Sequence, residues 1–415
     1  MSDLKTSIIE KNNALLCPEK IKIFNAIGID LVIGKRQGPY IYDVDGKKLI
    51  DLHLNGGTFN LGHCPEPILE ALNQAIQMGL DIGNHHFPSA QRGLLAEKLV
   101  ALTPGDMKAV VFASGGSEAV DVAIKSARHA TNRRKIISID QGFHGRTGLS
   151  GSVGNTKNAQ FFLSDTPQFS VTVPFNDLEK METALKAKDA AAVILETIPA
   201  TMGFPMPEQN YLSCVKTLCE KYGALYIADE IQTGLGRSGK LWAIEHYGVA
   251  PDILVTAKGL SGGIYPMAAA LLNQRAGEWL HQDGFAHIST FGGSEIGCYI
   301  ARKVLDIVSD PALLQRVDTI SAYLLTRLKA LQTTHPFLLE IRQKGFISGL
   351  KFDGEMAGIE MSKALYDNGI WAMFSGYDLS VIQFKPYMYT DKRLVDKIID
   401  IMEKAMNQCR AGSTT

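Results

Sequence analysis

The sequence predicts an α/β protein whose large domain is built on a mostly parallel β-sheet. From about Ala109 onward, short apolar runs alternate with amphipathic helical stretches, which is the pattern of strands covered by helices on both faces. The chain has 415 residues, too many for one small core, and 39 of them are glycine. So many glycines suit the tight turns and close backbone approaches of a ligand-binding α/β protein better than a helical bundle.

The individual elements can be assigned in chain order. Residues 29–54 are expected to form strands around the Asp45-Gly46 turn. Apolar runs then predict buried strands at 109–113, 135–139, 191–195, 224–228 and 253–256. One helix begins at Ser117, and another carries an apolar stripe that ends at Gly223. Beyond residue 310, an α+β tail is expected, with helices at 311–333 and about 391–408 and strands at 346–352 and 381–384.

The overall composition excludes several classes of function. The chain has 42 Lys and Arg against 43 Asp and Glu, a net charge of −1. It therefore lacks the excess of positive charge that is typical of proteins that bind nucleic acid or an anionic membrane. A small-molecule partner is favoured instead. The sequence has no apolar run of the length that a spanning helix needs, and the first residues lack a signal-peptide pattern. Six scattered cysteines are interpreted as reduced thiols of a cytoplasmic protein.

Candidate ligand-binding residues follow the predicted strands, because open α/β sheets bind ligands beyond the carboxyl ends of their strands. After the first strand, Ser114-Gly-Gly-Ser-Glu118 opens a helix, and free N–H groups at a helix N-terminus suit a phosphate. A tight strand–helix turn would explain the same glycines. The spacing matches neither the dinucleotide fingerprint nor the P-loop, which argues against a dinucleotide and against ATP.

Two charged residues occupy equivalent places after later strands. Asp229 ends one buried run, where a carboxylate is costly without a cationic partner, and a salt bridge to a neighbouring helix is the alternative. Lys258 lies in a glycine-flanked loop and is a candidate for covalent catalysis, although most lysines are simply surface residues. Together with a phosphate cup, these residues predict pyridoxal 5'-phosphate (PLP): Lys258 forms a Schiff base, and Asp229 keeps the pyridine nitrogen protonated. Phe143 and Ile231 offer faces that would sandwich the ring.

At this point the sequence resembles the class III aminotransferases of the ornithine, acetylornithine and 4-aminobutyrate group. The resemblance runs from about Gly38 to Pro386. It is carried, in order, by Tyr42-Asp-Val-Asp-Gly46, Asn60-Leu-Gly-His63, Ser114-Gly-Gly-Ser-Glu-Ala119, Gly142-Phe-His-Gly-Arg-Thr147, Asp229-Glu-Ile-Gln-Thr-Gly-Leu-Gly-Arg237, Pro251-Asp-Ile253, Ala257-Lys-Gly-Leu260 and Thr290-Phe-Gly-Gly293.

The resemblance implies the fold type I architecture of PLP-dependent transferases, with a seven-stranded type of sheet. It divides the chain into a segment 1–60 that joins the small domain, a large PLP-binding domain 61–310, and a small α+β domain 311–415. Lys258 would be the Schiff-base lysine, and Asp229 would pair with the pyridine nitrogen. The other cofactor contacts would be Gly116 and Ser117 on the phosphate, Phe143 and Ile231 on the ring, Gln232 on the ring hydroxyl, and Thr290. Because Thr290 would reach the phosphate of the neighbouring subunit, a homodimer with shared active sites is implied.

Three further positions bear on the substrate. Arg146 matches an arginine that grips a substrate carboxylate in some members, although a structural role is equally open. Glu196 matches a family glutamate whose usual partner is an arginine near the C-terminus. That arginine is replaced here by Gln383, in Gln383-Phe-Lys-Pro386, and an amide cannot supply an ionic clamp. Lys385 lies two residues further on, beside a proline, and this position leaves open whether it substitutes for the arginine.

These observations predict a PLP-dependent aminotransferase that moves an amino group from a terminal amine or ω-amino acid to a carbonyl acceptor, by a ping-pong mechanism. The acceptor would be a 2-oxo acid, an aldehyde or a ketone. An aminomutase, an amino-acid epimerase or a decarboxylase on the same scaffold would retain Lys258 and Asp229, so these remain alternatives. A non-enzymatic α/β binding protein is a further alternative. No metal is expected, because the adjacent His85 and His86 would face opposite sides of a strand.

Overall fold

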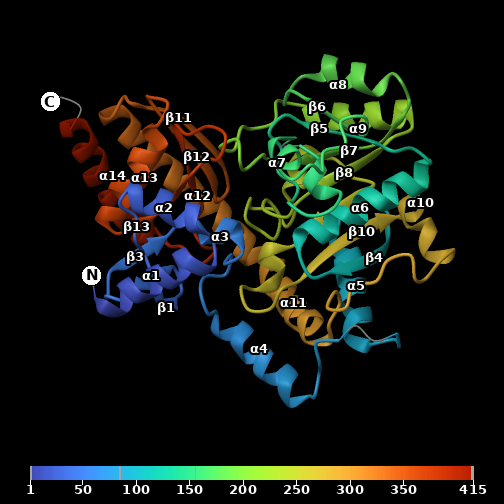
Figure 1. Cartoon of the computed structure of the whole chain (residues 1–415), viewed down its shortest axis with the longest axis horizontal. Helices are drawn as coiled ribbons and strands as arrows, with labels where there is room; N and C mark the ends of the chain where they lie inside the picture. The colour runs from blue at the N-terminus through green and yellow to red at the C-terminus, as the bar shows by residue number, and fades with distance from the viewer. Residues whose placement is uncertain (1, 84–85, 155, 413–415) are drawn as a thin grey trace.

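The computed structural model describes residues 2–83, 86–154 and 156–412. Two lobes lie side by side, and the larger one holds a seven-stranded sheet among these residues (Figure 1). Its strands lie in the order β4-β10-β9-β8-β7-β5-β6. Their bounds are β4 (Met107–Ala113), β5 (Lys135–Ile139), β6 (Ser170–Val173), β7 (Ala190–Glu196), β8 (Leu225–Asp229), β9 (Ile253–Thr256) and β10 (Ala268–Asn273).

The large sheet is mostly parallel, as the sequence predicts. Strands β5 to β9 pair in parallel, whereas β10 runs antiparallel to both of its neighbours, β4 and β9. Alternate residues of β7 belong to two separate apolar cores: Val193 and Leu195 to one, Ala192 and Ile194 to the other. The sheet is therefore buried on both faces, which explains why its strands are continuous apolar runs.

Helices cover the two faces of this sheet. Helix α6 (Gly116–Thr131) packs on β4, β7, β9 and β10, and α9 (Tyr211–Tyr222) packs on β8. The apolar stripe of α9 ends where Gly223 adopts a left-handed φ of 75°, as the sequence predicts. The remaining helices of this lobe are α4 (Glu66–Gln77), α5 (Ala90–Leu102), α7 (Thr156–Phe161), α8 (Leu178–Leu185), α10 (Gln274–Gly277) and α11 (Glu295–Val308).

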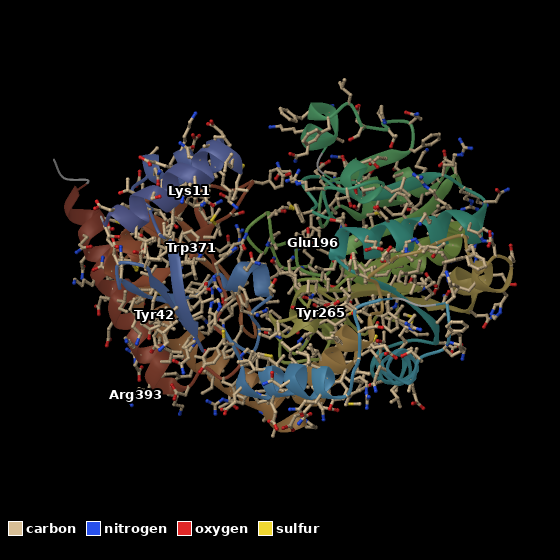
Figure 2. All side chains as sticks on the ribbon, turned by 60° about the horizontal axis from the view of Figure 1, so that its bottom comes forward. Lys11, Tyr42, Glu196, Tyr265, Trp371 and Arg393 are labelled. Atoms are coloured by element: carbon tan, nitrogen blue, oxygen red, sulfur yellow. The ribbon has the colours of Figure 1, made fainter. Side chains whose placement is uncertain are left out.

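The smaller lobe combines both ends of the chain, so that Tyr42 and Trp371 lie in it together (Figure 2). One sheet has the order β1-β2-β3-β13, in which β13 (Ile370–Trp371) pairs in parallel with β3. Its other strands are β1 (Ile33–Gln37), β2 (Tyr40–Asp43) and β3 (Lys48–Asp51). The second sheet has the order β11-β12-β15-β14, comprising β11 (Leu338–Lys344), β12 (Ile347–Phe352), β14 (Met373–Phe374) and β15 (Val381–Phe384).

The helices of the smaller lobe come from both ends of the chain as well. They are α1 (Asp3–Leu15), α2 (Pro18–Ala26), α3 (Leu54–Gly57), α12 (Pro311–Thr334), α13 (Ala357–Asn368) and α14 (Lys392–Gly412). Helix α12 begins where the Asp310 side chain accepts a hydrogen bond from the N–H of Ala312, with Pro311 in its first turn. None of the described helices is long and apolar enough to cross a membrane.

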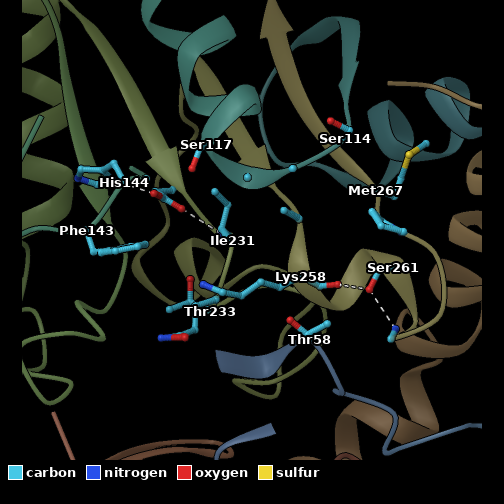
Figure 3. A pocket seen from close by; sticks show the side chains of 18 of the residues that line it. Thr58, Ser114, Ser117, Phe143, His144, Ile231, Thr233, Lys258, Ser261 and Met267 are labelled. Atoms are coloured by element: carbon cyan, nitrogen blue, oxygen red, sulfur yellow. Dashed lines mark hydrogen bonds and ion pairs between the residues drawn. The ribbon is translucent and has the colours of Figure 1, made fainter. Parts of the chain in front are cut away.

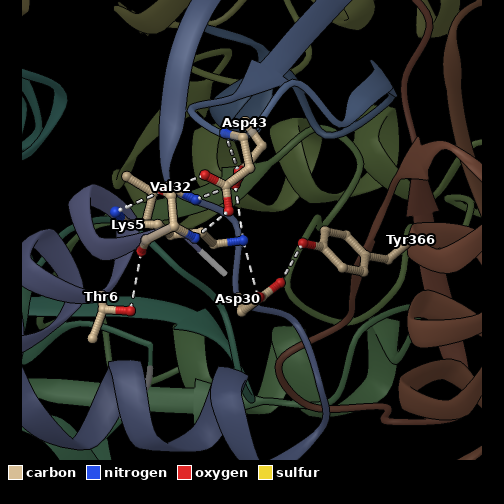
Figure 4. Close-up of polar contacts among 8 residues, drawn as sticks. Lys5, Thr6, Asp30, Val32, Asp43 and Tyr366 are labelled. Atoms are coloured by element: carbon tan, nitrogen blue, oxygen red, sulfur yellow. Dashed lines mark hydrogen bonds and ion pairs between the residues drawn. The ribbon is translucent and has the colours of Figure 1, made fainter.

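A buried ion-pair cluster ties helix α1 to the rest of the small lobe (Figure 4). Lys5 Nζ lies 2.9 Å from Asp30 Oδ2 and 3.2 Å from Asp43 Oδ2, and the Tyr366 hydroxyl donates to Asp30 over 2.9 Å. Burial lowers the pKa of Lys5, but hydrogen bonds and charges from both aspartates outweigh burial and raise that pKa above its ordinary value. The lysine is therefore held charged.

Candidate active site

A cavity of about 420 Å³ lies at the carboxyl ends of the large sheet's strands (Figure 3). Its wall includes residues that follow β4, β5, β8 and β9, together with the last residues of β7 and β8. The structure brings eight of the sequence-predicted site residues together in this wall. They are Gly116, Ser117, Phe143, Glu196, Asp229, Ile231, Gln232 and Lys258.

Lys258 extends into this cavity from a short 3₁₀ helix, Lys258–Ser261, that follows β9. Its φ of 42° is left-handed, and the Ser261 hydroxyl holds the turn by donating to the Lys258 carbonyl over 2.7 Å. Burial lowers the pKa of its amine below the ordinary value; Asp229 and Glu196 oppose this shift, and Arg237 adds to it. A larger neutral fraction makes the amine a better nucleophile.

Asp229 is the last residue of β8, and both of its oxygens are engaged by protein groups. His144 Nδ1 lies 2.7 Å from Oδ2, and Oδ1 accepts the N–H of Ile231 over 3.1 Å. His144 Nε2 is buried, with no hydrogen-bond partner in the described part of the chain. This histidine therefore fixes the carboxylate. His144 belongs to the motif Gly142–Thr147, but no spacing rule in the sequence links it to Asp229, 85 positions away.

The first turn of α6 forms a small cup at one end of the cavity. N–H groups in the first turn of a helix have no intrahelical partner, and Gly115 and Gly116 carry no side chains over them. Gly145 closes the cup with a φ of 139°, a conformation that favours glycine. A Cβ built on Gly145 would lie 2.6 Å from both Ser117 Oγ and Ser150 Oγ. The cup is thus bare backbone at a helix N-terminus, which suits a phosphate.

Glu196 lies beside Asp229, with which it is paired in the β7–β8 register. Its carboxylate accepts the N–H of Phe143 over 2.9 Å and the N–H of Ala200 over 3.1 Å. Burial, reinforced by the negative charge of Asp229, raises the pKa of Glu196, while His144 opposes the shift. No cationic side chain pairs with Glu196 in the described residues, in keeping with the missing arginine.

Gln383 lies in β15, behind the cavity wall rather than in it. Its Nε2 donates to the Ala200 carbonyl over 3.0 Å, and its Oε1 accepts from Lys385 Nζ over 2.7 Å. The Lys385 amine therefore lies within hydrogen-bond distance of the side chain at position 383. A strand places residues i and i+2 on the same face, so the spacing itself contained this signal.

Two further predicted residues, Arg146 and Thr290, lie outside the cavity. Arg146 is exposed, and its guanidinium carbon lies 5.1 Å from the centroid of the Phe143 ring. Thr290 is exposed as well and does not line this chain's own cavity. Their assigned roles remain predictions. His85 lies outside the described residues, and the described part of the chain holds no cluster of three metal-ligating side chains.

Sequence reasoning also gave no role to Glu230, the neighbour of Asp229. Its fully buried carboxyl accepts hydrogen bonds from the hydroxyls of Thr197 (2.6 Å) and Thr233 (2.7 Å) and from the N–H groups of Ala243 (3.0 Å) and Ile244 (2.8 Å). Burial outweighs these bonds and raises the pKa of Glu230 to about 7. Glu230 therefore connects, through its hydrogen bonds, the loops that carry these four residues, and it does not itself line the cavity.

The residues present fit pyridoxal phosphate. An amine with a lowered pKa, a carboxylate fixed by a buried histidine, and a bare helix N-terminus surround one cavity of about 420 Å³. Phe143 and Ile231 add an aromatic and an aliphatic side chain to the same wall (Figure 3). PLP requires a lysine for its aldehyde, an anion for its ring nitrogen and an anion site for its phosphate.

Comparisons with known proteins agree with this fit. Residues 25–406 match the family model described as aminotransferase class III. An uncharacterized aminotransferase from Archaeoglobus fulgidus is 45% identical over 402 residues, which cover 97% of this chain and 94% of that protein. Acetylornithine aminotransferase from Streptococcus mutans is 33% identical over 381 residues, covering 91% and 97%. The crystal structure of ornithine aminotransferase from Toxoplasma gondii shares the fold, with a TM-score of 0.90, 24% identity and coverage of 98% and 96%.

The family model spans most of the chain, and the Archaeoglobus and Streptococcus relatives match along nearly their whole lengths. The alternative of a non-enzymatic binding protein is therefore excluded. The chain belongs to the class III aminotransferase family and is a pyridoxal-phosphate-dependent transaminase.

Proposed function

We propose that this aminotransferase takes its amino group from a terminal amine or an ω-amino acid and passes it to a 2-oxo acid or another carbonyl acceptor. The observation that carries the proposal is the amide of Gln383 at the place of an arginine. A 2-amino acid donor presents a carboxylate next to the reacting carbon, and Gln383 has no charge to bind it. Relatives named acetylornithine aminotransferase and ornithine aminotransferase support this donor class.

The residues of the cavity would divide the work as follows. Lys258 would bind the cofactor covalently, and its released amine would then move a proton to and from the donor carbon as general base and acid. The bound cofactor supplies an electron sink that makes this proton removable. Asp229, oriented by His144, would hold a positive charge at the ring nitrogen. The remaining contacts would be Gly116 and Ser117 to the phosphate, Phe143 and Ile231 to the ring, and Gln232 to the ring hydroxyl.

Glu196 and Arg146 would bear on the substrate rather than the cofactor. Glu196 lines the cavity and has no cationic partner among the described residues, so it adds negative potential where a donor ammonium would arrive. Arg146 lies above Phe143 at the surface, where it would meet a substrate carboxylate at the cavity mouth. We further propose a cytoplasmic homodimer in which Thr290 of each subunit completes the partner's phosphate site.

The experiment is a panel of half-reactions that follow the cofactor absorbance after addition of one donor. Alanine, glutamate, 4-aminobutyrate, ornithine and a diamine are compared, each without and with a carbonyl acceptor. The proposal expects the terminal amines to react faster than alanine and glutamate. A strong preference for glutamate would contradict the inference from Gln383. Turnover of an amino acid without any added acceptor would instead indicate an epimerase or aminomutase.

A further inference from the structure

A second cavity, larger than the proposed active site, lies beside it and has no role in the proposed chemistry. Its volume is about 1140 Å³, and it is lined by residues of helices α1 and α2 and of strands β1, β2 and β13. Much of its wall is aliphatic or aromatic, including Ile9, Phe24, Leu31, Ile33, Ile41 and Trp371. Among the charged side chains of this wall, Asp30 is paired with Lys5 and Asp51 with His63, whereas Lys20 and Arg36 are exposed. Mostly apolar walls with a few polar groups are typical of sites for small molecules.

The two cavities meet at three residues that line both of them, Phe59, Gly263 and Ile264. Gly263 is bare at this point: a Cβ built on it would lie 2.7 Å from Cδ1 of the Phe59 ring. Its N–H donates to the Ser261 hydroxyl over 3.0 Å, and the same hydroxyl holds the turn of Lys258. The second cavity therefore begins at the turn that carries the proposed Schiff-base lysine.

The size of the first cavity explains why a donor would need the second one. Its 420 Å³ lies near the lower end of the range of about 300–1000 Å³ that is typical of a site for one small ligand. PLP would take up much of this space, so only the reacting end of a donor fits beside the cofactor. The rest of a longer donor must extend out of the first cavity, and the apolar wall that adjoins it at Phe59 and Ile264 belongs to the second.

We propose that the second cavity binds the apolar chain of the amine donor, so that the preferred donors carry their terminal amine on a long hydrocarbon chain. Each methylene that enters the cavity leaves water, and its burial strengthens binding of the donor. The passage beside Gly263 places the amine end of such a chain at Lys258, while the chain itself lies against α1, α2 and β1. This inference rests on the proposed function, because it names the class of terminal amine that the enzyme uses.

The first test is binding without turnover. The PLP-loaded enzyme is titrated by calorimetry with 1-octanol, which has an apolar chain but no amine. We expect binding with a negative heat-capacity change, because apolar surface leaves water. Ile33→Asp places a carboxylate in the wall of the second cavity and should weaken octanol binding about fivefold or more. Leu339→Asp is the matched control, because Leu339 is also an aliphatic strand residue, is 51% exposed against 50% for Ile33, and lines neither cavity. Failure of the wild type to bind octanol, or equal losses in both variants, would overturn the proposal.

The second test is a series of donor half-reactions with butylamine, hexylamine and octylamine. The kcat/KM of the wild type should rise about two- to fourfold for each added methylene, which is the gain expected from burying that group. Ile33→Asp should lower the ratio of the octylamine value to the butylamine value, and Leu339→Asp should leave this ratio unchanged. A wild-type series that does not rise with chain length would overturn the proposal. If no amine reacts at all, the proposed function fails, and the octanol titration alone then decides whether the cavity accepts an apolar chain.

Discussion

Replacing Gly145 by alanine tests whether the cup at the N-terminus of α6 holds the cofactor phosphate. A Cβ at this position would lie 2.6 Å from Ser117 Oγ and 2.9 Å from Ser117 Cβ. The backbone φ of 139° is itself strained for any residue with a side chain. Because the Ser117 backbone belongs to the helix, the clash must move either the loop or the first turn of α6, and both carry the cup.

The expected size of the effect follows from these two costs. A non-glycine residue held in such a conformation costs about 1–3 kcal/mol, and displacing Ser117 adds to that. If about 2 kcal/mol of this strain is relieved by opening the loop in the cofactor-free protein, the dissociation constant for PLP rises about thirtyfold. Urea unfolding of the cofactor-free protein should show the remainder, about 1 kcal/mol or less of lost stability.

The assay is a titration of the cofactor-free protein with PLP, followed by absorbance, alongside urea unfolding. Gly93→Ala is the control, because Gly93 lies in helix α5 and a Cβ there would meet no atom within 4 Å. That variant should bind PLP like the wild type and be slightly more stable, since alanine favours a helix over glycine. A Gly145→Ala protein with unchanged PLP affinity and unchanged stability would refute the reasoning.

Three further changes test other parts of the structure. Glu230→Gln removes a carboxyl group whose pKa rises from 4.5 to about 7 on folding. The folded wild type therefore binds more protons than the unfolded chain between these pH values. Its free energy of unfolding falls by about 3 kcal/mol as the pH rises from 4.5 to 7. The variant should lose this part of the pH slope in urea melts, and an unchanged slope would contradict the buried-carboxyl account. His144→Ala should slow the donor half-reaction about tenfold to a hundredfold, because a lost partner of a buried carboxylate costs about 1–3 kcal/mol; an unaltered rate would argue against its role on Asp229. Lys5→Met should destabilise the chain by about 3 kcal/mol, because it leaves Asp43 buried without its cation, whereas Lys180→Met at the exposed Asp177 pair should stay within about 0.5 kcal/mol.

The parts of the fold that the sequence predicts are those with one dominant local pattern. The run 191–195 lies inside β7, and the stripe that ends at Gly223 is α9, because burial on both sheet faces and a left-handed cap each leave a clear pattern. Strand β10 (Ala268–Asn273) was not predicted. Its alanines favour helix intrinsically, and only pairing with β4 and β9 on both sides makes it a strand.

The site shows the same division. The shared position of Asp229, at the end of β8, and Lys258, just after β9, was predictable because parallel strands bring their carboxyl ends to one edge. The residues that contact these two side chains were not predictable from the sequence. His144 reaches Asp229 through tertiary packing, and neither motif nor composition encodes that contact. Lys5, in the first turn of the chain, likewise gives no sign in the sequence that it pairs with Asp30 and Asp43.

The central claim is that Lys258 carries the cofactor in the cavity at the carboxyl ends of the sheet. Borohydride reduction of the PLP-loaded enzyme fixes the bond between lysine and cofactor, and mass spectrometry of the digested protein then locates the added mass. We predict the label on the peptide that contains Lys258, and its loss in Lys258→Ala together with the visible absorbance band. A label on any other lysine, including the buried Lys385, or a protein that stays colourless after PLP is added, would contradict the account.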